Sequence, residues 1–155
     1  MRTPYPDSER SVLRLWLRLL ACTNLIEGSL GGALRSRFAS TLPRFDLLSQ
    51  LHRHPDGLLM SELSRRLMVT GGNVTGLAVS LESDGLIRRE PVAGDRRATR
   101  LKLTPKGKMR FEEMAQAHEA WVREMFSALS ATERHTLYQL LGALKQGLPA
   151  QSPDA

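Results

Sequence analysis

The chain has 155 residues, enough for one domain or for a small domain with an oligomerisation element, and its 25% charged and 41% hydrophobic residues are typical of a soluble globular protein. No apolar run reaches the ~18 residues that a membrane-spanning helix needs, and a single cysteine, Cys22, excludes an internal disulfide. The net charge of +6 is concentrated, because residues 86–110 alone carry nine Lys or Arg and two Asp or Glu. Such a patch favours a polyanionic partner, most often nucleic acid, with a solvated charged face as the ordinary alternative.

The N-terminal part predicts a loose arm over residues 1–8 and then one long helix, capped by Ser8 or Ser11 and ending near Ala39. Residues 19–22 resemble a lipoprotein cleavage site, but arginines at every fourth position from 10 to 18 interrupt the apolar run that a signal peptide requires. We therefore expect an amphipathic helix in a cytoplasmic protein. A helix of about 30 residues is too long for a chain of this size to cover, so part of its apolar stripe is expected to meet another chain.

The middle of the chain predicts short elements separated by turns. A helix is expected from Arg44 to about His52, a very short strand at residues 58–60, and a short helix over residues 62–67 capped by Ser61. Thr70 is expected to cap the next helix, which ends at Gly85 in the left-handed conformation. Residues 86–90 and 99–103 are predicted hairpin strands, because they follow or precede a Pro/Gly turn and the second alternates polar with apolar residues.

Two helices follow the hairpin. Thr104-Pro105 starts a long helix that carries apolar residues from Met109 to Leu129, and the capping box Ser130–Glu133 starts the last helix. A short helix, a turn, a second helix and a β-hairpin form a winged helix-turn-helix, whose second helix enters the major groove of DNA. The sequence therefore predicts a mostly α fold with a small β-hairpin wing.

The predicted recognition helix has one apolar face, formed by Val74, Leu77 and Leu81, and one face of small, uncharged residues. A solvated helix would carry Glu and Lys there, whereas a helix that approaches bases and phosphates closely needs small polar groups. The candidate DNA-binding residues on and before this helix are Thr70, Gly71, Gly72, Asn73, Thr75, Gly76 and Ser80.

The hairpin tip carries Arg96 and Arg97, which we expect to reach the adjacent minor groove, where a narrow groove attracts arginine. Asp95 beside them is expected to orient a guanidinium through a two-point hydrogen bond.

Three short motifs carry a resemblance to a known family: Leu-Glu-x-x-Gly-Leu-Ile at 81–87, Asp-Arg-Arg at 95–97 and Leu-Thr-x-x-Gly at 103–107. Over residues 42–108 the chain resembles the MarR family of bacterial transcription regulators. The resemblance implies a DNA-binding part over residues 41–104, flanked by dimerisation helices in residues 1–40 and 105–155. It also implies a homodimer on a palindromic operator, usually a repressor, with Arg97 as the minor-groove arginine and Asp95 as its partner.

The chain departs from the family pattern at Val79-Ser80, where many members have Asp-Arg. A phosphate-contacting arginine is therefore absent from that position. Arg65, Arg66 and Arg88 are the candidates to replace it.

The resemblance further implies an effector, often an aromatic acid, in a cavity where the first, second and fifth helices meet. Arginines from those segments could hold its carboxylate, and their number suggests an aromatic acyl-CoA as another possibility. The alternative is that they are solvated or belong to the DNA footprint, and that the aromatic residues are core. The candidate effector-binding residues are Arg14, Trp16, Arg18, Asn24, Arg35, Arg37, Arg44, Phe45 and His52.

Other chemistry finds little support in the sequence. Gly71–Gly76 has the glycine spacing of a phosphate-binding loop but lacks the Lys and Ser/Thr that must follow. We predict no enzyme activity, no metal and no cofactor, and we interpret Cys22 as a small buried apolar residue rather than a redox sensor. A winged-helix module that binds a protein partner or coats chromosomes without sequence preference is the alternative function.

Overall fold

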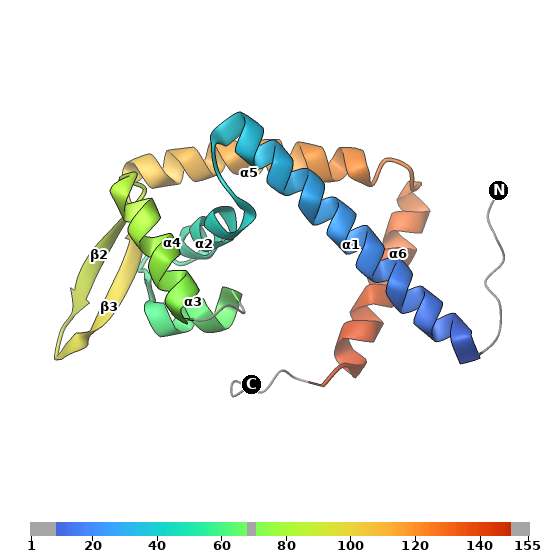
Figure 1. Ribbon diagram of the computed structural model, residues 1–155, viewed down its shortest axis with the longest axis horizontal. Coiled ribbons are helices and arrows are strands. Elements are labelled where there is room, and N and C mark those ends of the chain that lie inside the picture. Colours follow the sequence, from blue (N-terminus) through green and yellow to red (C-terminus); the bar gives the residue numbers. More distant parts are fainter. Residues whose placement is uncertain (1–8, 68–70, 150–155) are drawn as a thin grey trace. The chain divides into compact units, whose positions relative to one another are not determined.

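The computed structural model describes residues 9–67 and 71–149. It is mostly α-helical with one small antiparallel sheet, as predicted, and its elements in chain order are α1 (Glu9–Phe38), α2 (Leu42–Arg53), β1 (Leu58–Leu59), α3 (Met60–Leu67), α4 (Gly71–Ser83), β2 (Ile87–Val92), β3 (Asp95–Leu103), α5 (Pro105–Met125) and α6 (Ala131–Gly147) (Figure 1). The chain divides into two compact units, residues 1–42 and 43–155, which are described separately. Within the described ranges, none of the helices is both long enough and apolar enough to cross a bilayer.

The first unit is the helix α1 and the turn that ends it. The three glycines at 28, 31 and 32 do not interrupt the helix, which is continuous from Glu9 to Phe38. Ala39 then takes the left-handed conformation (φ 51°), and the Ser40 N–H donates to the Leu34 carbonyl at 3.3 Å, which closes the helix in a Schellman-type turn. Cys22 is exposed, so the expectation that it is buried is wrong for the single chain.

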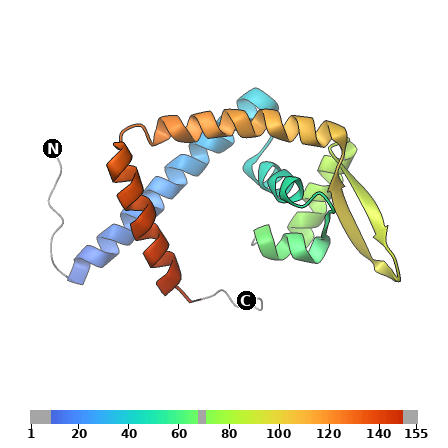
Figure 2. The ribbon, with the colours of Figure 1, turned by 180° about the vertical axis from the view of Figure 1, so that it is seen from behind.

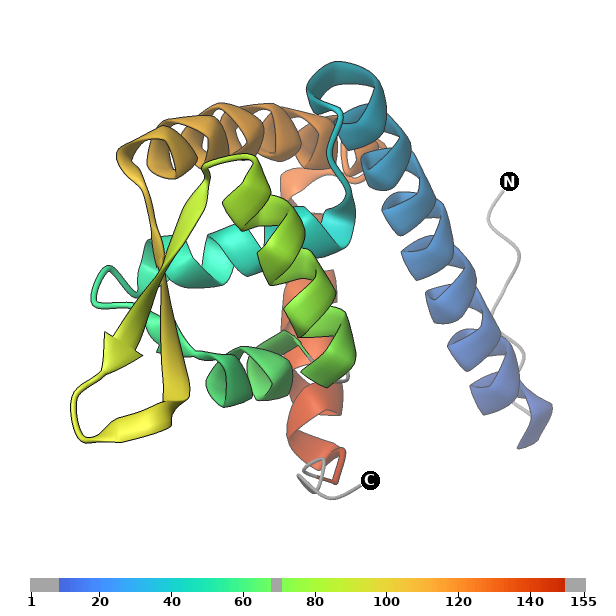
Figure 3. The same ribbon diagram turned by 60° about the vertical axis from the view of Figure 1, so that its left-hand side comes forward.

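The core of the second unit is built from the inner faces of α2, α3, α4, β3 and α5. Its fully buried side chains include Leu48, Leu63, Val74, Leu81 and Met114. Ala78 is also fully buried, whereas Leu77 is only half-buried, so the inner face of α4 differs by one residue from the predicted face. Figure 3 shows α4 beside the hairpin and close to α3, which places the outer face of α4 and the hairpin tip in one unit.

The sheet has the strand order β1-β3-β2, with both pairs antiparallel. Both hairpin strands are longer than predicted, because β2 continues to Val92 and β3 begins at Asp95, on either side of a turn in which Gly94 has φ 82°. Pro91 is tolerated inside β2 because this is an edge strand, where a missing N–H breaks no inner ladder. The arginines at the tip therefore lie on strand backbone rather than in a loop.

The helix ends follow the predicted caps in some places and not in others. The helix α3 begins at Met60 rather than after Ser61, and the Glu62 carboxylate accepts the Leu59 N–H at 2.7 Å. The predicted Thr70 cap lies outside the described residues. In the second unit α5 runs on from β3 and ends at Met125, before Leu129, and α6 follows it after a short turn (Figure 2). The Ser130–Glu133 capping box is confirmed in both directions.

The end of α4 and the start of α5 are joined by a compact set of backbone contacts. Gly85 has φ 72°, as predicted for the residue that terminates α4. The Thr104 hydroxyl donates to the Gly85 carbonyl at 2.6 Å and accepts the Gly107 N–H at 3.0 Å, while the Thr104 N–H donates to the Leu86 carbonyl at 3.1 Å. A Cβ on Gly107 would lie 1.8 Å from the Leu86 carbonyl oxygen. Two of the sequence motifs, at 81–87 and 103–107, therefore meet at this junction.

We expect Gly107→Ala to lower the free energy of unfolding by about 2 kcal/mol or more, because the added methyl would collide with backbone that cannot rotate away. Urea denaturation followed by circular dichroism measures the effect. Gly76→Ala is the matched control, since a Cβ at Gly76 meets nothing within 4 Å and alanine is the better helix former by roughly 0.5–1 kcal/mol. Equal stabilities of the two variants would contradict the steric argument.

Candidate nucleic-acid interface and effector residues

The outer face of α4 is exposed and uncharged through most of its length. Asn73, Thr75, Gly76 and Ser80 are all exposed, and the helix has no acidic residue in its first turn and no basic residue in its last. Gly71 and Gly72 form the first turn of α4, while Thr70 lies outside the described residues. A glycine at position 76 costs helix stability and is not required by packing, since a Cβ there would meet open space. Most side chains on this face are therefore small, so the backbone of another molecule can approach the helix closely.

Val79 belongs to the same face, although the sequence prediction omitted it. Its side chain is 56% exposed, between Gly76 and Ser80 along the helix. Helical spacing could have identified it, because Val79 follows Thr75 by four residues and Gly76 by three. An exposed apolar group among small polar ones offers a contact for a thymine methyl group in the major groove.

The hairpin tip presents two exposed arginines. Arg96 and Arg97 are exposed on β3, and in the part of the chain that the structure describes neither guanidinium has a side-chain partner. The Asp95 Oδ1 atom accepts the backbone N–H of Arg97 at 2.9 Å. The carboxylate was expected to hold a guanidinium, and it instead shapes the backbone that follows the turn. Both arginine side chains remain available for a phosphate or a groove.

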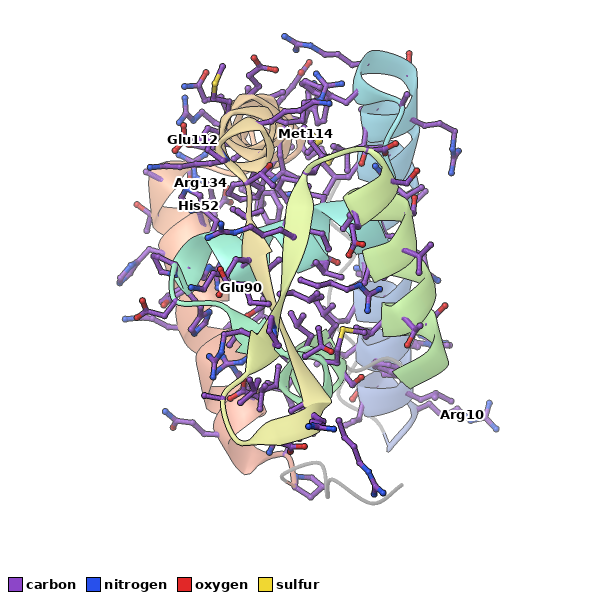
Figure 4. All side chains as sticks on the ribbon, turned by 90° about the vertical axis from the view of Figure 1, so that its left-hand side faces the viewer. Arg10, His52, Glu90, Glu112, Met114 and Arg134 are labelled. Atoms are coloured by element: carbon purple, nitrogen blue, oxygen red, sulfur yellow. The ribbon has the colours of Figure 1, made fainter. Side chains whose placement is uncertain are left out.

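Other cations of the hairpin are engaged by carboxylates. Glu90 lies on β2 (Figure 4), where Lys102 contacts it at 2.9 Å and Arg88 at 3.0 Å. The hydrogen bond from Lys102 and the charges of the neighbouring arginines hold the pKa of Glu90 below its usual value. Arg88 is exposed despite its ion pair, so it can also face a phosphate. Arg65, in the last turn of α3, is exposed and lines a cavity of about 270 Å³ with Glu62 and Arg66.

Arg44 has partners at the C-terminal end of α4. This residue of α2, expected to bind an effector, donates hydrogen bonds to the Ser80 hydroxyl and to the Asp84 carboxylate. Its side chain is only 15% exposed. Ser80, expected to contact DNA, is therefore also the acceptor of a hydrogen bond that joins α2 to α4.

Two other predicted effector residues belong to a ring cluster between α2 and α5. Phe45 is buried and its ring lies 5.4 Å from that of Phe111 and 4.6 Å from that of His118. Burial lowers the pKa of His118, against the opposing charge of Asp46. His52 contacts the Phe111 ring and lies close to Glu112, with 3.3 Å between Nε2 and Oε1 (Figure 4). These contacts show that both residues take part in packing.

The remaining predicted effector residues lie on α1, in the other unit. All are exposed in the single chain, and the Arg37 guanidinium lies 5.4 Å from the centre of the Phe38 ring. Together they are Arg14, Trp16, Arg18, Asn24, Arg35 and Arg37. A set of three or more metal-ligating side chains does not occur among the residues that the structure describes.

Comparison with known proteins relates the chain to a family of transcription regulators. A family model described as MarR family matches residues 41–98. The transcriptional activatory protein BadR of Rhodopseudomonas palustris is 31% identical over 135 residues, which are 84% of this chain and 77% of that protein. The chain is also 30% identical over 105 residues to the Bacillus subtilis regulator YdgJ, of whose length the match spans 63%.

Solved structures with a similar fold are also transcription regulators of the MarR type. A MarR family transcriptional regulator from Silicibacter pomeroyi is 31% identical, with a TM-score of 0.75 over 92% of this chain and 99% of that one. A variant of MarR from E. coli, solved in complex with operator DNA, is 26% identical, with a TM-score of 0.77 over 93% of this chain and 100% of that one. These relatives are transcription regulators rather than enzymes.

Replacing Arg97 by alanine is expected to weaken DNA binding by about tenfold or more, because an exposed cation at the hairpin tip is lost. Fluorescence anisotropy with labelled duplex DNA measures the affinity, and light scattering checks that the oligomeric state is unchanged. Arg123→Ala removes the same charge from an exposed position on α5, where the arginine pairs with Glu119. Equal affinities of the two variants would remove Arg97 from the interface.

Proposed function

The chain belongs to the MarR family of DNA-binding transcription regulators, and we propose that it binds a palindromic operator as a homodimer and represses transcription until an aromatic acid or its CoA thioester releases the DNA. One observation supports this most directly: the small, uncharged outer face of α4 lies in the same unit as a hairpin tip with two exposed arginines. One surface offers base contacts in the major groove and the other offers charge to the adjacent minor groove.

In the proposed complex, α4 lies in the major groove with Asn73, Thr75 and Val79 toward the base edges. Asparagine can pair with adenine through two hydrogen bonds, and Thr and Val methyl groups can contact thymine. The first turn of α4, at Gly71 and Gly72, would direct backbone N–H groups toward a phosphate, where the helix dipole also favours an anion. Arg65 and Arg88 would neutralise flanking phosphates, and Arg96 and Arg97 would enter the minor groove, with Asp95 shaping the tip.

The homodimer is proposed from apolar surface that the single chain leaves exposed. The helix α6 has no buried residue, and its apolar side chains are exposed: Tyr138 is 79% and Leu140 64% exposed. On α1 the exposed apolar residues are Val12, Leu13, Leu15, Trp16, Leu17, Leu20 and Leu25. An isolated helix gains too little to be stable in water, and apolar surface of this extent marks an interaction site. A second copy of the chain would cover both helices and place two α4 helices about one turn of DNA apart, ~34–36 Å.

Leu144→Glu is expected to convert the dimer to monomers, because it puts a charge into the apolar surface of α6. Size-exclusion chromatography with light scattering gives the mass. Met109→Glu is the matched control, since it makes the same change in chemistry at a residue of α5 that is 65% exposed. A monomeric wild-type chain, or a dimeric Leu144→Glu variant, would contradict the proposed interface.

The effector proposal concerns the arginines of α1. Arg14, Arg18, Arg35 and Arg37 are exposed cations that could hold a carboxylate or the phosphates of a CoA group. Such a ligand releases DNA only if it binds the DNA-incompetent spacing of the two α4 helices more tightly than the competent one. BadR is named an activatory protein, so regulation in the activating direction is the second possibility.

Selection from a random pool of duplex DNA at moderate salt tests the proposal. A palindromic motif with half-sites one turn apart, bound far more tightly than scrambled DNA, is the expected result. That motif then serves as the probe for release by benzoate-type acids and their CoA thioesters. Tight binding without sequence enrichment that vanishes as salt rises would instead favour a non-specific chromosome-coating module.

A further inference from the structure

The start of α2 and the end of α4 each carry a charge that their own helix disfavours. Peptide dipoles make a helix N-terminus positive and its C-terminus negative. Arg44 is a cation in the first turn of α2, where no acidic residue accompanies it. Glu82 is an anion in the last turn of α4 and Asp84 directly follows that helix, which has no basic residue in its last turn. Neither charge stabilises its own helix. Arg44 and Asp84 instead form an ion pair with each other, between the start of α2 and the end of α4.

The two nitrogens Nη1 and Nη2 of one planar guanidinium hold α4 at two points. Arg44 donates to the Ser80 hydroxyl of α4 and to the carboxylate of Asp84, the residue after α4. The Asp84 N–H donates to the Ser80 carbonyl at 3.2 Å, so the helical spacing continues to Asp84 and both partners lie on the same side. A rigid fork with two attachment points restrains rotation of a helix about its axis as well as its position. The cation thus satisfies the C-terminus of α4, and the carboxylate supplies the anion that the N-terminus of α2 lacks.

Other basic groups complete the same end of α4. The Arg89 Nε atom of β2 contacts the Glu82 carboxylate at 2.6 Å, and the Lys106 Nζ atom of α5 donates to the Asp84 carbonyl at 2.8 Å. Arg44 differs from these two because it lies on α2, a helix separated from α1 by only three residues. Only 15% of its side chain is exposed.

We propose that Arg44 is a positioning residue for DNA binding, which sets the rotation of α4 through Ser80 and Asp84 without contacting DNA itself. The inference rests on the proposed function. It assigns Ser80 a second task, as acceptor for Arg44, and it makes the start of α2 the place from which the recognition helix is oriented. If α4 were rotated, the cations of α3 and of the wing would still lie near the DNA phosphates, but Gly76 and Val79 would be misdirected.

The test compares Arg44→Gln, Asp84→Asn and the double variant with Arg53→Gln, a matched control at an exposed arginine in the last turn of α2. Each single variant is expected to lower operator affinity by about 3- to 10-fold, and the double variant by no more than either, because the same contact is lost. Affinity for scrambled DNA and the slope of log affinity against log salt should stay unchanged. Arg88→Ala should instead lower that slope by about one unit, as expected when one neutralised phosphate is lost.

Deuterium exchange on the DNA-free protein supplies a readout that does not depend on an operator. Peptides covering residues 71–85 are expected to exchange faster in Arg44→Gln and Asp84→Asn than in Arg53→Gln, while α6 peptides are unchanged. Unchanged exchange in α4 would overturn the inference, as would additive losses in the double variant, an unaffected Asp84→Asn affinity, or a salt slope lowered by Arg44→Gln. If the wild-type chain shows no sequence-selective binding, the proposed function fails, and the exchange measurement alone decides whether Arg44 positions α4.

Discussion

The junction between Gly85-Leu86 and Thr104-Gly107 is the contact on which the rest of the second unit depends. The Thr104 hydroxyl serves two backbone groups at once, since it donates to the Gly85 carbonyl and accepts the Gly107 N–H. The missing side chain of Gly107 lets the first turn of α5 approach the Leu86 carbonyl closely. Because α4 ends and α5 begins at this point, the chain must leave and return as a hairpin. The wing is therefore placed by the same contacts that terminate α4.

Charge is distributed over this unit in two distinct ways. Basic groups near the end of α4 are held by its carboxylates, as with Arg44 and Arg89, and those at the base of the wing are held by Glu90. The arginines at the tip, Arg96 and Arg97, are exposed, and among the described residues neither guanidinium has a side-chain partner. Internal pairing thus stabilises the scaffold and leaves charge at the edge that the proposed complex directs to DNA. A high net charge alone would not distinguish these two roles.

Apolar surface shows a similar division. The inner faces of α2, α4 and α5 are closed into a core, with Leu48, Leu81 and Met114 almost fully buried. The helix α6 buries none of its residues, and α1 exposes a run that includes Trp16 and Leu25. A single chain therefore leaves α6, and the part of α1 that carries the exposed apolar residues, without the packing that normally stabilises a helix. This imbalance is the physical reason to propose a second copy of the chain as the partner of these helices.

The sequence by itself determined the order of the elements and most of their ends, because helical periodicity, strand alternation and caps depend on residues a few positions apart. Gly85, Thr104 and the Ser130–Glu133 box were all predictable for this reason, and the short motifs identified the family. Only the tertiary structure decided that Asp95 binds the Arg97 backbone, that Glu62 caps α3, and that Ala78 replaces Leu77 in the core. It alone placed Arg44 against Ser80 and Asp84, which are 36 and 40 residues away along the chain. Partners at such separations are chosen by how helices pack, and neither the spacing nor the composition of the sequence contains that information.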